Sequence, residues 1–298
     1  MERLTSLERA KKTLELSEPD RVPLFELLID SNVINKILPD SSYEDFVDYI
    51  GLDLVLTGSP SIMYDQIVLD ESKKITIDEW GIKRQFSEQK VAIPFEGPIK
   101  NREDLLKYKA PDPISERRFV DLMMLIDRFK GKKAIGIHLH DAFSYPWYLR
   151  CMENIFMDFI LNPDIVKELI RISIEHNIML AEKTIKLGAD VVVLGDDYGS
   201  TLGPMFSPEH FEKFLLPGLR EIVKAIKNSG AYCIKHCCGN INILLDMIVN
   251  SGINALHPLD MTTNMNIDSV KKKYGEKICV IGGMDCGELL CNDSRKMS

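Results

Sequence analysis

Residues 187–197 read LGADVVVLGDD, and this stretch decides the fold class. Gly188 stands at the end of a long segment with helical periodicity, where a glycine commonly terminates a helix. The apolar run from Val191 to Leu194 follows, and a short β-branched run of this kind is typical of a buried parallel strand. Asp196 and Asp197 come directly after it. The stretch therefore predicts a helix followed by a buried strand that ends in polar side chains.

The same alternation of amphipathic helix and short apolar strand continues on both sides of this stretch. Helices are predicted over residues 4–16, 42–50, 115–129, 145–161, 162–187, 207–228, 241–250 and 267–274, with a break at Pro217-Gly218. Strands are predicted over residues 22–29 and near residues 53, 133, 190, 232, 253 and 278. This alternation indicates a parallel sheet, because consecutive parallel strands need a crossover between them that is usually helical.

The predicted fold class is therefore α/β, a (β/α)8 TIM barrel that lacks its last β/α unit. Seven strands are counted without a linker between them, and the polar segment 291–298 is too short to supply an eighth unit. We expect a single barrel domain over residues 1–298 whose C-terminal unit is truncated. Residues 75–98 depart from the pattern, because alternating apolar positions there predict hairpins that decorate the barrel.

Charge and hydropathy limit the classes of partner. The net charge of −8 and the pI near 5.4 argue against binding to nucleic acid or to a membrane surface, because such binders need an excess of Lys and Arg. Apolar runs long enough to span a bilayer are absent, and the first fifteen residues lack the apolar core of a signal peptide. We therefore expect a cytoplasmic protein that acts on a small molecule.

Seven cysteines occur in the chain, and six of them lie after residue 232. An odd number of cysteines in a large chain without a secretion signal argues against a disulfide framework. Their concentration in the last third of the chain points instead to a metal site.

Polar residues follow the predicted strands at positions where a packed core would have none. The strand ends read His138-Leu139-His140-Asp141, Gly195-Asp196-Asp197-Tyr198, His236-Cys237-Cys238-Gly239-Asn240, His257-Pro258-Leu259-Asp260 and Gly282-Gly283-Met284-Asp285-Cys286. Functional residues of a parallel barrel lie at the carboxyl ends of its strands, so these side chains are expected to face one cavity.

His236 and Cys238 form the most specific pattern among these strand ends. Residues i and i+2 of a strand point the same way, so the imidazole and the thiolate can share one metal ion while Cys237 points away. Zn²⁺ accepts this mixture of nitrogen and sulfur and normally takes four ligands. Asp260 is the best third ligand and Cys286 a fourth, each at the end of a later strand. The alternative is a cysteine buried as a small apolar residue, since His-x-Cys alone is a permissive pattern.

Two further pairs are candidates for catalysis. Asp196 and Asp197 are adjacent and point in opposite directions, so only one is expected to enter the pocket as a general acid/base or substrate anchor. A helix N-cap or a solvated loop is the alternative for this pair. His138 and His140 share a face, and they either contact the substrate or satisfy a polar layer of the barrel.

The order of these motifs resembles the uroporphyrinogen decarboxylase superfamily over nearly the whole chain. The resemblance is carried by Asp20-Arg21-Val22-Pro23, Asp78-Glu79-Trp80-Gly81, the segment from Gly195-Asp196-Asp197 to Ser207-Pro208-Glu209, His236-Cys237-Cys238-Gly239-Asn240, Lys271 to Gly275 and Gly282-Gly283-Met284-Asp285. It implies one of two chemistries, which are decarboxylation of a porphyrinogen without a cofactor and corrinoid-dependent methyl transfer with zinc.

The N-terminal region favours methyl transfer. Porphyrinogen decarboxylases of this superfamily carry an arginine-rich segment that grips the substrate carboxylates, whereas residues 24–35 here contain Glu26 and Asp30 and no arginine. These two carboxylates would repel a substrate that carries many carboxylates itself. The other branch resembles methylcobalamin:coenzyme M methyltransferases, which hold zinc with a His-x-Cys pair and a later cysteine, and His236 and Cys238 match that pair.

The resemblance thus implies a zinc-dependent methyltransferase that moves a methyl group between a corrinoid and a thiol or similar acceptor. The expected cofactors are zinc and a corrinoid, which is supplied as methylcobalamin or carried by a partner protein. Asn240 and Asp285 are the predicted cofactor-binding residues. Zinc would lower the pKa of the thiol and present a thiolate nucleophile. Two alternatives stay open, a uroporphyrinogen decarboxylase and a non-catalytic binding partner or fragment within a corrinoid protein system.

Overall fold

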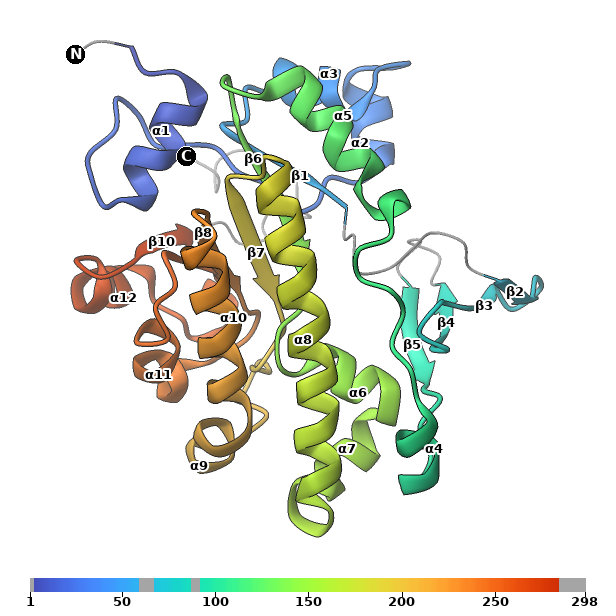
Figure 1. Cartoon of the computed structure of the whole chain (residues 1–298). Coiled ribbons are helices and arrows are strands. Elements are labelled where there is room, and N and C mark those ends of the chain that lie inside the picture. Colours follow the sequence, from blue (N-terminus) through green and yellow to red (C-terminus); the bar gives the residue numbers. More distant parts are fainter. Residues whose placement is uncertain (1–2, 59–66, 87–91, 284–298) are drawn as a thin grey trace.

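The computed structural model describes residues 3–58, 67–86 and 92–283, which form two sheets and the helices around them (Figure 1). In the main sheet the strand order is β1-β6-β7-β8-β9-β10, and every neighbouring pair is parallel. Its strands are β1 (Leu54–Thr57), β6 (Ala134–Leu139), β7 (Val191–Gly195), β8 (Tyr232–His236), β9 (Ala255–Leu259) and β10 (Cys279–Gly282). Strands follow one another in space as they do in the chain, so the predicted fold class is confirmed as an incomplete, six-stranded parallel barrel.

Helices cover one face of this sheet, and α8 and α10 lie side by side across it (Figure 1). The helices are α1 (Ser6–Leu14), α2 (Ser31–Ile37), α3 (Tyr43–Tyr49), α4 (Arg102–Lys107), α5 (Val120–Phe129), α6 (Ser144–Arg150), α7 (Met152–Leu161), α8 (Pro163–Leu187), α9 (Pro208–His210), α10 (Leu216–Asn228), α11 (Leu245–Val249) and α12 (Ile267–Tyr274). As predicted, α8 begins at a proline and ends at Gly188, whose φ of 130° continues the chain away from the helix. Within the described ranges, no helix is both long enough and apolar enough to cross a membrane.

The strand predicted over residues 22–29 is reduced to a single parallel bridge between Phe25 and Leu54. Pro23 has no N–H to give to a ladder, and the N–H of Leu24 donates to the carboxylate of Asp53 (2.8 Å) rather than to a backbone carbonyl. The segment therefore lies where the first barrel strand was expected, but it lacks the repeated hydrogen bonds of a strand.

The helix predicted over residues 145–161 is broken at Cys151, whose φ of 69° is unusual for a residue with a side chain. The N–H of Ile99 donates to the carbonyl of Leu149 (3.1 Å), which would otherwise continue the helical ladder. Gly97 packs so closely that a Cβ atom there would lie 2.2 Å from the same carbonyl oxygen. A segment distant in the chain therefore ends α6, which is why local periodicity did not predict the break.

The break predicted at Pro217-Gly218 is displaced toward the N-terminus. A π-helical turn spans Phe211–Leu215, and Pro217 then lies in the first turn of α10. The wider turn accommodates a proline that lacks an N–H and whose ring crowds the preceding turn.

Residues 67–86 and 92–96 form a separate antiparallel sheet, as the predicted hairpins suggested. Its strands are β2 (Ile67–Asp70), β3 (Ile75–Ile77), β4 (Lys83–Phe86) and β5 (Ala92–Glu96). Trp80, in the turn between β3 and β4, is buried and stacks on Tyr145 of α6 with ring centroids 3.8 Å apart. Arg84 of β4 lies 4.9 Å over the ring of Tyr148, so the small sheet packs against the barrel beside the end of β6.

A buried carboxylate ties the N-terminal segment to the barrel. Asp53 has no exposed surface and accepts hydrogen bonds from Arg9 Nη1 (2.7 Å), Arg21 Nη1 (2.8 Å) and the backbone N–H of Leu24. Arg9 is itself buried and also pairs with Asp20 (2.6 Å). A buried charge needs a partner, so these contacts hold α1 and residues 20–25 beside β1.

We expect Asp53→Ala to lower the free energy of unfolding by about 3–5 kcal/mol, because it leaves the buried guanidinium of Arg9 partly unpaired. Urea denaturation followed by circular dichroism measures the change. Glu175→Gln is the control, since it breaks an exposed pair with Arg171 and should change the same quantity by less than about 1 kcal/mol. Equal stability of the two variants would contradict the anchoring role of Asp53.

Candidate metal centre

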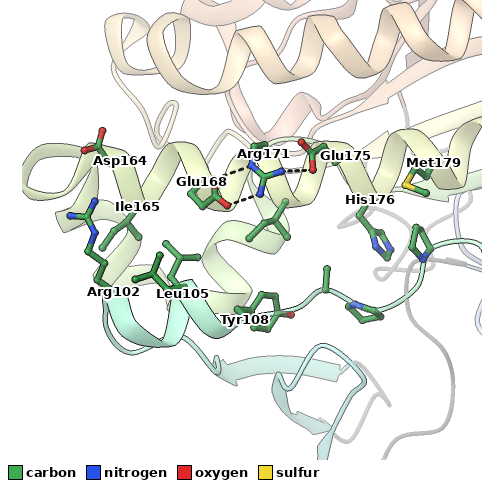
Figure 2. Close-up of a pocket in the computed structure, with 15 residues that line it drawn as sticks. Arg102, Leu105, Tyr108, Asp164, Ile165, Glu168, Arg171, Glu175, His176 and Met179 are labelled. Carbon is green, nitrogen blue, oxygen red and sulfur yellow. Dashed lines mark hydrogen bonds and ion pairs between the residues drawn. The ribbon is translucent and has the colours of Figure 1, made fainter.

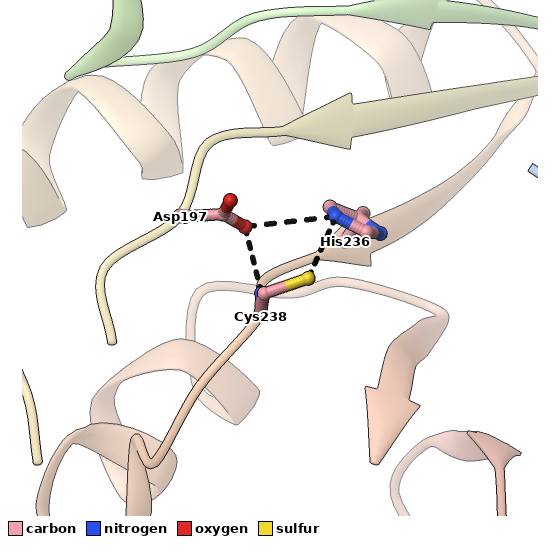
Figure 3. Close-up of side chains that lie close together, drawn as sticks. All are labelled: Asp197, His236 and Cys238. Carbon is pink, nitrogen blue, oxygen red and sulfur yellow. Dashed lines mark hydrogen bonds and ion pairs between the residues drawn. The ribbon is translucent and has the colours of Figure 1, made fainter. Parts of the chain in front are cut away.

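Three side chains meet at the carboxyl ends of β7 and β8 (Figure 3). Asp197, His236 and Cys238 each offer one ligand atom, and these atoms lie within 4.8 Å of one another. His236 Nε2 is 3.4 Å from Cys238 Sγ and 3.5 Å from Asp197 Oδ1. The N–H of Cys238 donates to the same Asp197 oxygen (2.7 Å). We call these three residues the strand-end group.

The alternation of side chains along a strand explains the group. His236 is the last residue of β8, and Cys238 stands two residues later, so both side chains point to the same side, the interior of the barrel. Cys237 turns the other way, is buried, and its sulfur accepts a hydrogen bond from the N–H of Tyr198 (3.2 Å). Asp197 reaches the group because β7 and β8 are parallel neighbours, with Gly195 opposite His236.

The spacing within the strand-end group suits a zinc ion. Zinc binds nitrogen and carboxylate oxygen at about 2.0–2.2 Å and sulfur at about 2.3 Å, so tetrahedral ligands stand roughly 3.3–3.7 Å apart. The separations from His236 Nε2 to Cys238 Sγ (3.4 Å) and to Asp197 Oδ1 (3.5 Å) fall in this range. Nitrogen, sulfur and oxygen donors also match the ligand types that zinc accepts.

A second imidazole fixes the orientation of the first. His257 of β9 is paired with His236 in the sheet register, and the two Nδ1 atoms lie 2.8 Å apart, so one of them carries the shared proton. Burial, together with the neighbouring His257, lowers the pKa of His236 to about 2, and burial lowers that of His257 to about 4. Both rings are therefore neutral at pH 7. When His236 carries the shared proton on Nδ1, its Nε2 presents a lone pair to the strand-end group.

The thiol of Cys238 needs a cation to ionise. Burial, with the nearby carboxylate of Asp197, raises the pKa of this thiol to about 12. A thiol in such surroundings is protonated at pH 7, whereas a bound metal ion would favour the thiolate. The strand-end group therefore has the ligand atoms for a metal, and its cysteine is not an activated nucleophile by itself.

The other predicted metal and cofactor residues lie outside this group or outside the described residues. Asp260 caps the turn Met261–Thr263, where its Oδ1 accepts from the N–H (2.9 Å) and the hydroxyl (2.6 Å) of Thr262. Asn240 Oδ1 accepts from the N–H of Asn242 (3.1 Å) within its own loop. Asp285 and Cys286 fall in residues 284–298, which the structure does not describe. The ligand role of Asp260 and the cofactor role of Asn240 stay predictions.

The two aspartates at the end of β7 diverge as the alternation predicts. Asp197 enters the strand-end group, whereas Asp196 is buried and accepts from the N–H groups of Phe143 (2.6 Å) and Ser144 (2.9 Å) at the start of α6. His140 Nδ1 lies 3.0 Å from Asp196. Burial alone would raise the pKa of Asp196, but the His140 contact and the nearby positive charge of Lys235 hold it well below its usual value. The contacts of Asp196 make it an anchor for α6, and its catalytic role stays a prediction.

His138 occupies the interior of the barrel below the group. Burial, with the neighbouring His140, lowers the pKa of His138 to about 3, so the ring is neutral. Its Nε2 is buried without a hydrogen-bond partner among the described residues and packs over Gly195 of β7. A Cβ atom on Gly195 would lie 1.8 Å from this nitrogen, so only glycine leaves room for the ring.

Sequence reasoning placed His257 and Asp141 at strand ends but missed that they partner His236 and Lys235. His257 stands opposite His236 in the register, a relation that strand parity could have suggested. Lys235 follows the apolar residues Cys233 and Ile234 in the predicted strand, and a lysine at such a position was the sequence signal that could have identified it.

A separate groove of about 710 Å³ lies outside the barrel, between α4 and α8 (Figure 2). Arg171 on its rim donates to Glu168 (2.6 Å) and Glu175 (2.5 Å), so these charges are paired with one another. The strand-end group therefore remains the better candidate for chemistry.

Parallel strands with possible metal ligands converging at their carboxyl ends define a barrel-type α/β fold with a candidate metal centre. The chain belongs to the uroporphyrinogen decarboxylase (URO-D) family, whose family model matches residues 63–298. The resemblance predicted from the sequence motifs is confirmed.

Relatives with two different names are similar to this chain. The methylcobamide:CoM methyltransferase MtbA of Methanosarcina mazei is 27% identical over 139 residues, which cover 46% of this chain and 39% of the relative. The uroporphyrinogen decarboxylase of Aliivibrio salmonicida is 26% identical over 214 residues, which cover 67% of this chain and 58% of the relative. The chain thus spans about two fifths to three fifths of the length of these relatives.

A solved structure shares the fold. A methyltransferase from Methanosarcina mazei superposes with a TM-score of 0.69 at 16% identity, covering 94% of this chain and 82% of that one. At this identity the agreement shows the fold alone, and it supports the incomplete barrel described above.

We expect Gly195→Ala to destabilise the protein by about 1–3 kcal/mol, because the added methyl group would overlap the imidazole of His138. Thermal unfolding monitored by circular dichroism measures the loss. Gly203→Ala is the matched control, since a Cβ atom there meets nothing within 4 Å. If both variants unfolded at the temperature of the wild type, the packing of His138 over β7 would be wrong.

Proposed function

We propose that this chain is a zinc-dependent methyltransferase that moves a methyl group between a corrinoid and a thiol or similar acceptor. The single observation that carries the proposal is the convergence of Asp197, His236 and Cys238 at the end of the barrel strands. The name of the MtbA relative, a methylcobamide:CoM methyltransferase, supports the same chemistry.

Zinc would be held by His236 Nε2, Cys238 Sγ and a carboxylate oxygen of Asp197, and three protein ligands leave the fourth position of a tetrahedral ion for a substrate. A substrate thiol at that fourth position would have its pKa lowered by the ion, so that a thiolate would be available at neutral pH. We propose Asp197 as the third ligand in preference to Asp260, because a carboxylate oxygen of Asp197 lies with His236 Nε2 and Cys238 Sγ, whereas Asp260 caps its own turn.

The chain's own residues prepare this position in three ways. His257 orients the ring of His236 through the contact between their Nδ1 atoms. The N–H of Cys238 holds the carboxylate of Asp197 beside the sulfur. Buried apolar side chains of the strands, such as Ile234 and Val193, line the interior below the group and exclude water from that side.

We expect the purified protein to contain about one zinc ion per chain, as a single catalytic site requires. His236→Ala and Cys238→Ser should each abolish stoichiometric zinc, and Asp197→Asn should weaken zinc binding, because each removes a proposed ligand. Mass spectrometry of the metal content measures the result. Cys151→Ser is the control, since that cysteine lies outside the strand-end group and should leave the zinc content unchanged.

Methyl transfer is tested with methylcobalamin and a series of small thiols, followed by the loss of the methylcobalamin absorbance. Activity that disappears in Cys238→Ser and persists in Cys151→Ser supports the proposal. Zinc bound as expected but without turnover of any thiol would favour the non-catalytic role within a corrinoid system.

Uroporphyrinogen decarboxylation is the second candidate, because several relatives carry that name. The N-terminal segment opposes it. Glu26 is an exposed carboxylate, and Asp30 is exposed where it caps α2, so both can face an approaching substrate. Arg21, the arginine nearest in the chain to this segment, pairs with Asp53 instead of facing a substrate. Turnover of uroporphyrinogen under anaerobic conditions by metal-free protein would replace the methyltransferase proposal.

A further inference from the structure

A buried ion pair stands behind the strand-end group, on the other face of β8. Lys235 and Asp141 have no exposed surface, and Lys235 Nζ lies 2.7 Å from Asp141 Oδ2. The hydroxyl of Tyr198 donates to the other oxygen of Asp141, and Lys235 Nζ lies 4.2 Å over the Tyr198 ring. We call Lys235, Asp141 and Tyr198 the buried lysine network.

The stability of the fold alone does not explain why this buried ion pair is present. Burying a charged pair contributes little net stability, and apolar replacements of a buried pair are often neutral or stabilising. Lys235 Nζ and Asp141 Oδ2 lie at hydrogen-bonding distance, away from solvent, so what the pair holds in place must be read from its other contacts.

Those contacts lead directly to Asp197. Lys235 Nζ donates to the backbone carbonyl of Asp196 (2.7 Å), which belongs to the peptide group that joins Asp196 to Asp197. On the other side of Asp197, the Tyr198 side chain is held by Asp141 and its N–H donates to Cys237 Sγ (3.2 Å). Both chain neighbours of Asp197 are thus fixed, although its own side chain is about half exposed (51%).

The same contacts fix the other two members of the strand-end group. Lys235 immediately precedes His236 in β8, and Cys237 stands between His236 and Cys238. The network therefore fixes the chain neighbours of all three ligand residues. Its members come from the ends of three strands, because Asp141 follows β6, Asp196 follows β7 and Lys235 lies in β8.

On this basis, and resting on the proposed function, we infer that Lys235 is a positioning residue that sets the geometry of the Asp197–His236–Cys238 metal site through the peptide between Asp196 and Asp197. It touches neither metal nor substrate. Residues in this supporting position around metal sites typically change metal affinity about 10- to 100-fold when they are replaced.

The test uses Lys235→Met combined with Asp141→Asn, which removes both charges while the asparagine oxygen can still accept from Tyr198 and from the N–H of Ala142. We expect this double variant to fold, to bind Co²⁺ about 10- to 100-fold more weakly than the wild type, and to show a changed Co²⁺ absorption spectrum in the visible range. A role in stability alone would leave the spectrum of the metal-loaded, folded protein unchanged.

Lys133→Met is the matched control, because Lys133 is also a buried lysine that donates to a backbone carbonyl, that of Leu52 (2.7 Å), but it lies at the opposite end of β6. It should leave Co²⁺ affinity and spectrum as in the wild type. Tyr198→Phe removes a single hydroxyl from the network and should weaken Co²⁺ binding by a smaller factor, which keeps the inference testable if the double variant does not fold.

The outcomes separate this inference from the proposed function. If the wild type binds Co²⁺ through Cys238 and the folded double variant, or Tyr198→Phe in its place, binds it with the same affinity and spectrum, the positioning role is wrong and the metal site stands. A wild type that binds no Co²⁺ or Zn²⁺ would overturn the metal site and the inference together. An equal loss in Lys133→Met would show a general effect of buried lysines and would overturn the positioning role.

Discussion

The parallel register of β6 to β9 is the constraint on which the site depends. Gly195 lies opposite His236, and His236 lies opposite His257, so the three positions form one row across neighbouring strands. Parallel strands end at the same edge, which is why side chains from distant parts of the chain meet there. The glycine in this row is as important as the histidines, because it leaves the space that the ring of His138 occupies. A shift of β8 by one residue would exchange its two faces and disperse the group.

The two faces of β8 carry opposite kinds of polar residues. The interior face presents two neutral groups, the imidazole of His236 and the thiol of Cys238. Burial lowers the pKa of the imidazole and raises that of the thiol, so neither is charged at pH 7. The outer face presents the charged Lys235, paired with Asp141. A cation placed between the interior groups would meet sulfur, nitrogen and carboxylate oxygen, while the existing ammonium stays on the far side of the strand. The strand thus separates a fixed positive charge from the position where a metal would bind.

Family membership alone does not choose between methyl transfer and decarboxylation, since relatives of both names match the chain. The difference has to lie in the residues that the common barrel presents at its strand ends. Here those residues include the His-x-Cys pair, and the N-terminal segment carries carboxylates and no arginine between residues 24 and 35. The electrostatics of that segment suit a substrate with few negative charges better than one with many.

The sequence by itself determined the order of helices and strands, the parallel barrel class and the common face of His236 and Cys238, because periodicity and turn residues act over a few neighbouring positions. Only the tertiary structure decided which carboxylate lies beside that pair. Asp260 is bound by Thr262 of its own turn, while Asp197 is drawn to the N–H of Cys238, 41 residues away. It also decided that the carbonyl of Leu149 accepts a hydrogen bond from the N–H of Ile99, which ends a helix that the local sequence would continue. These contacts depend on which hydrogen-bond partners, distant in the chain, compete for the same group. A local sequence pattern does not contain that information.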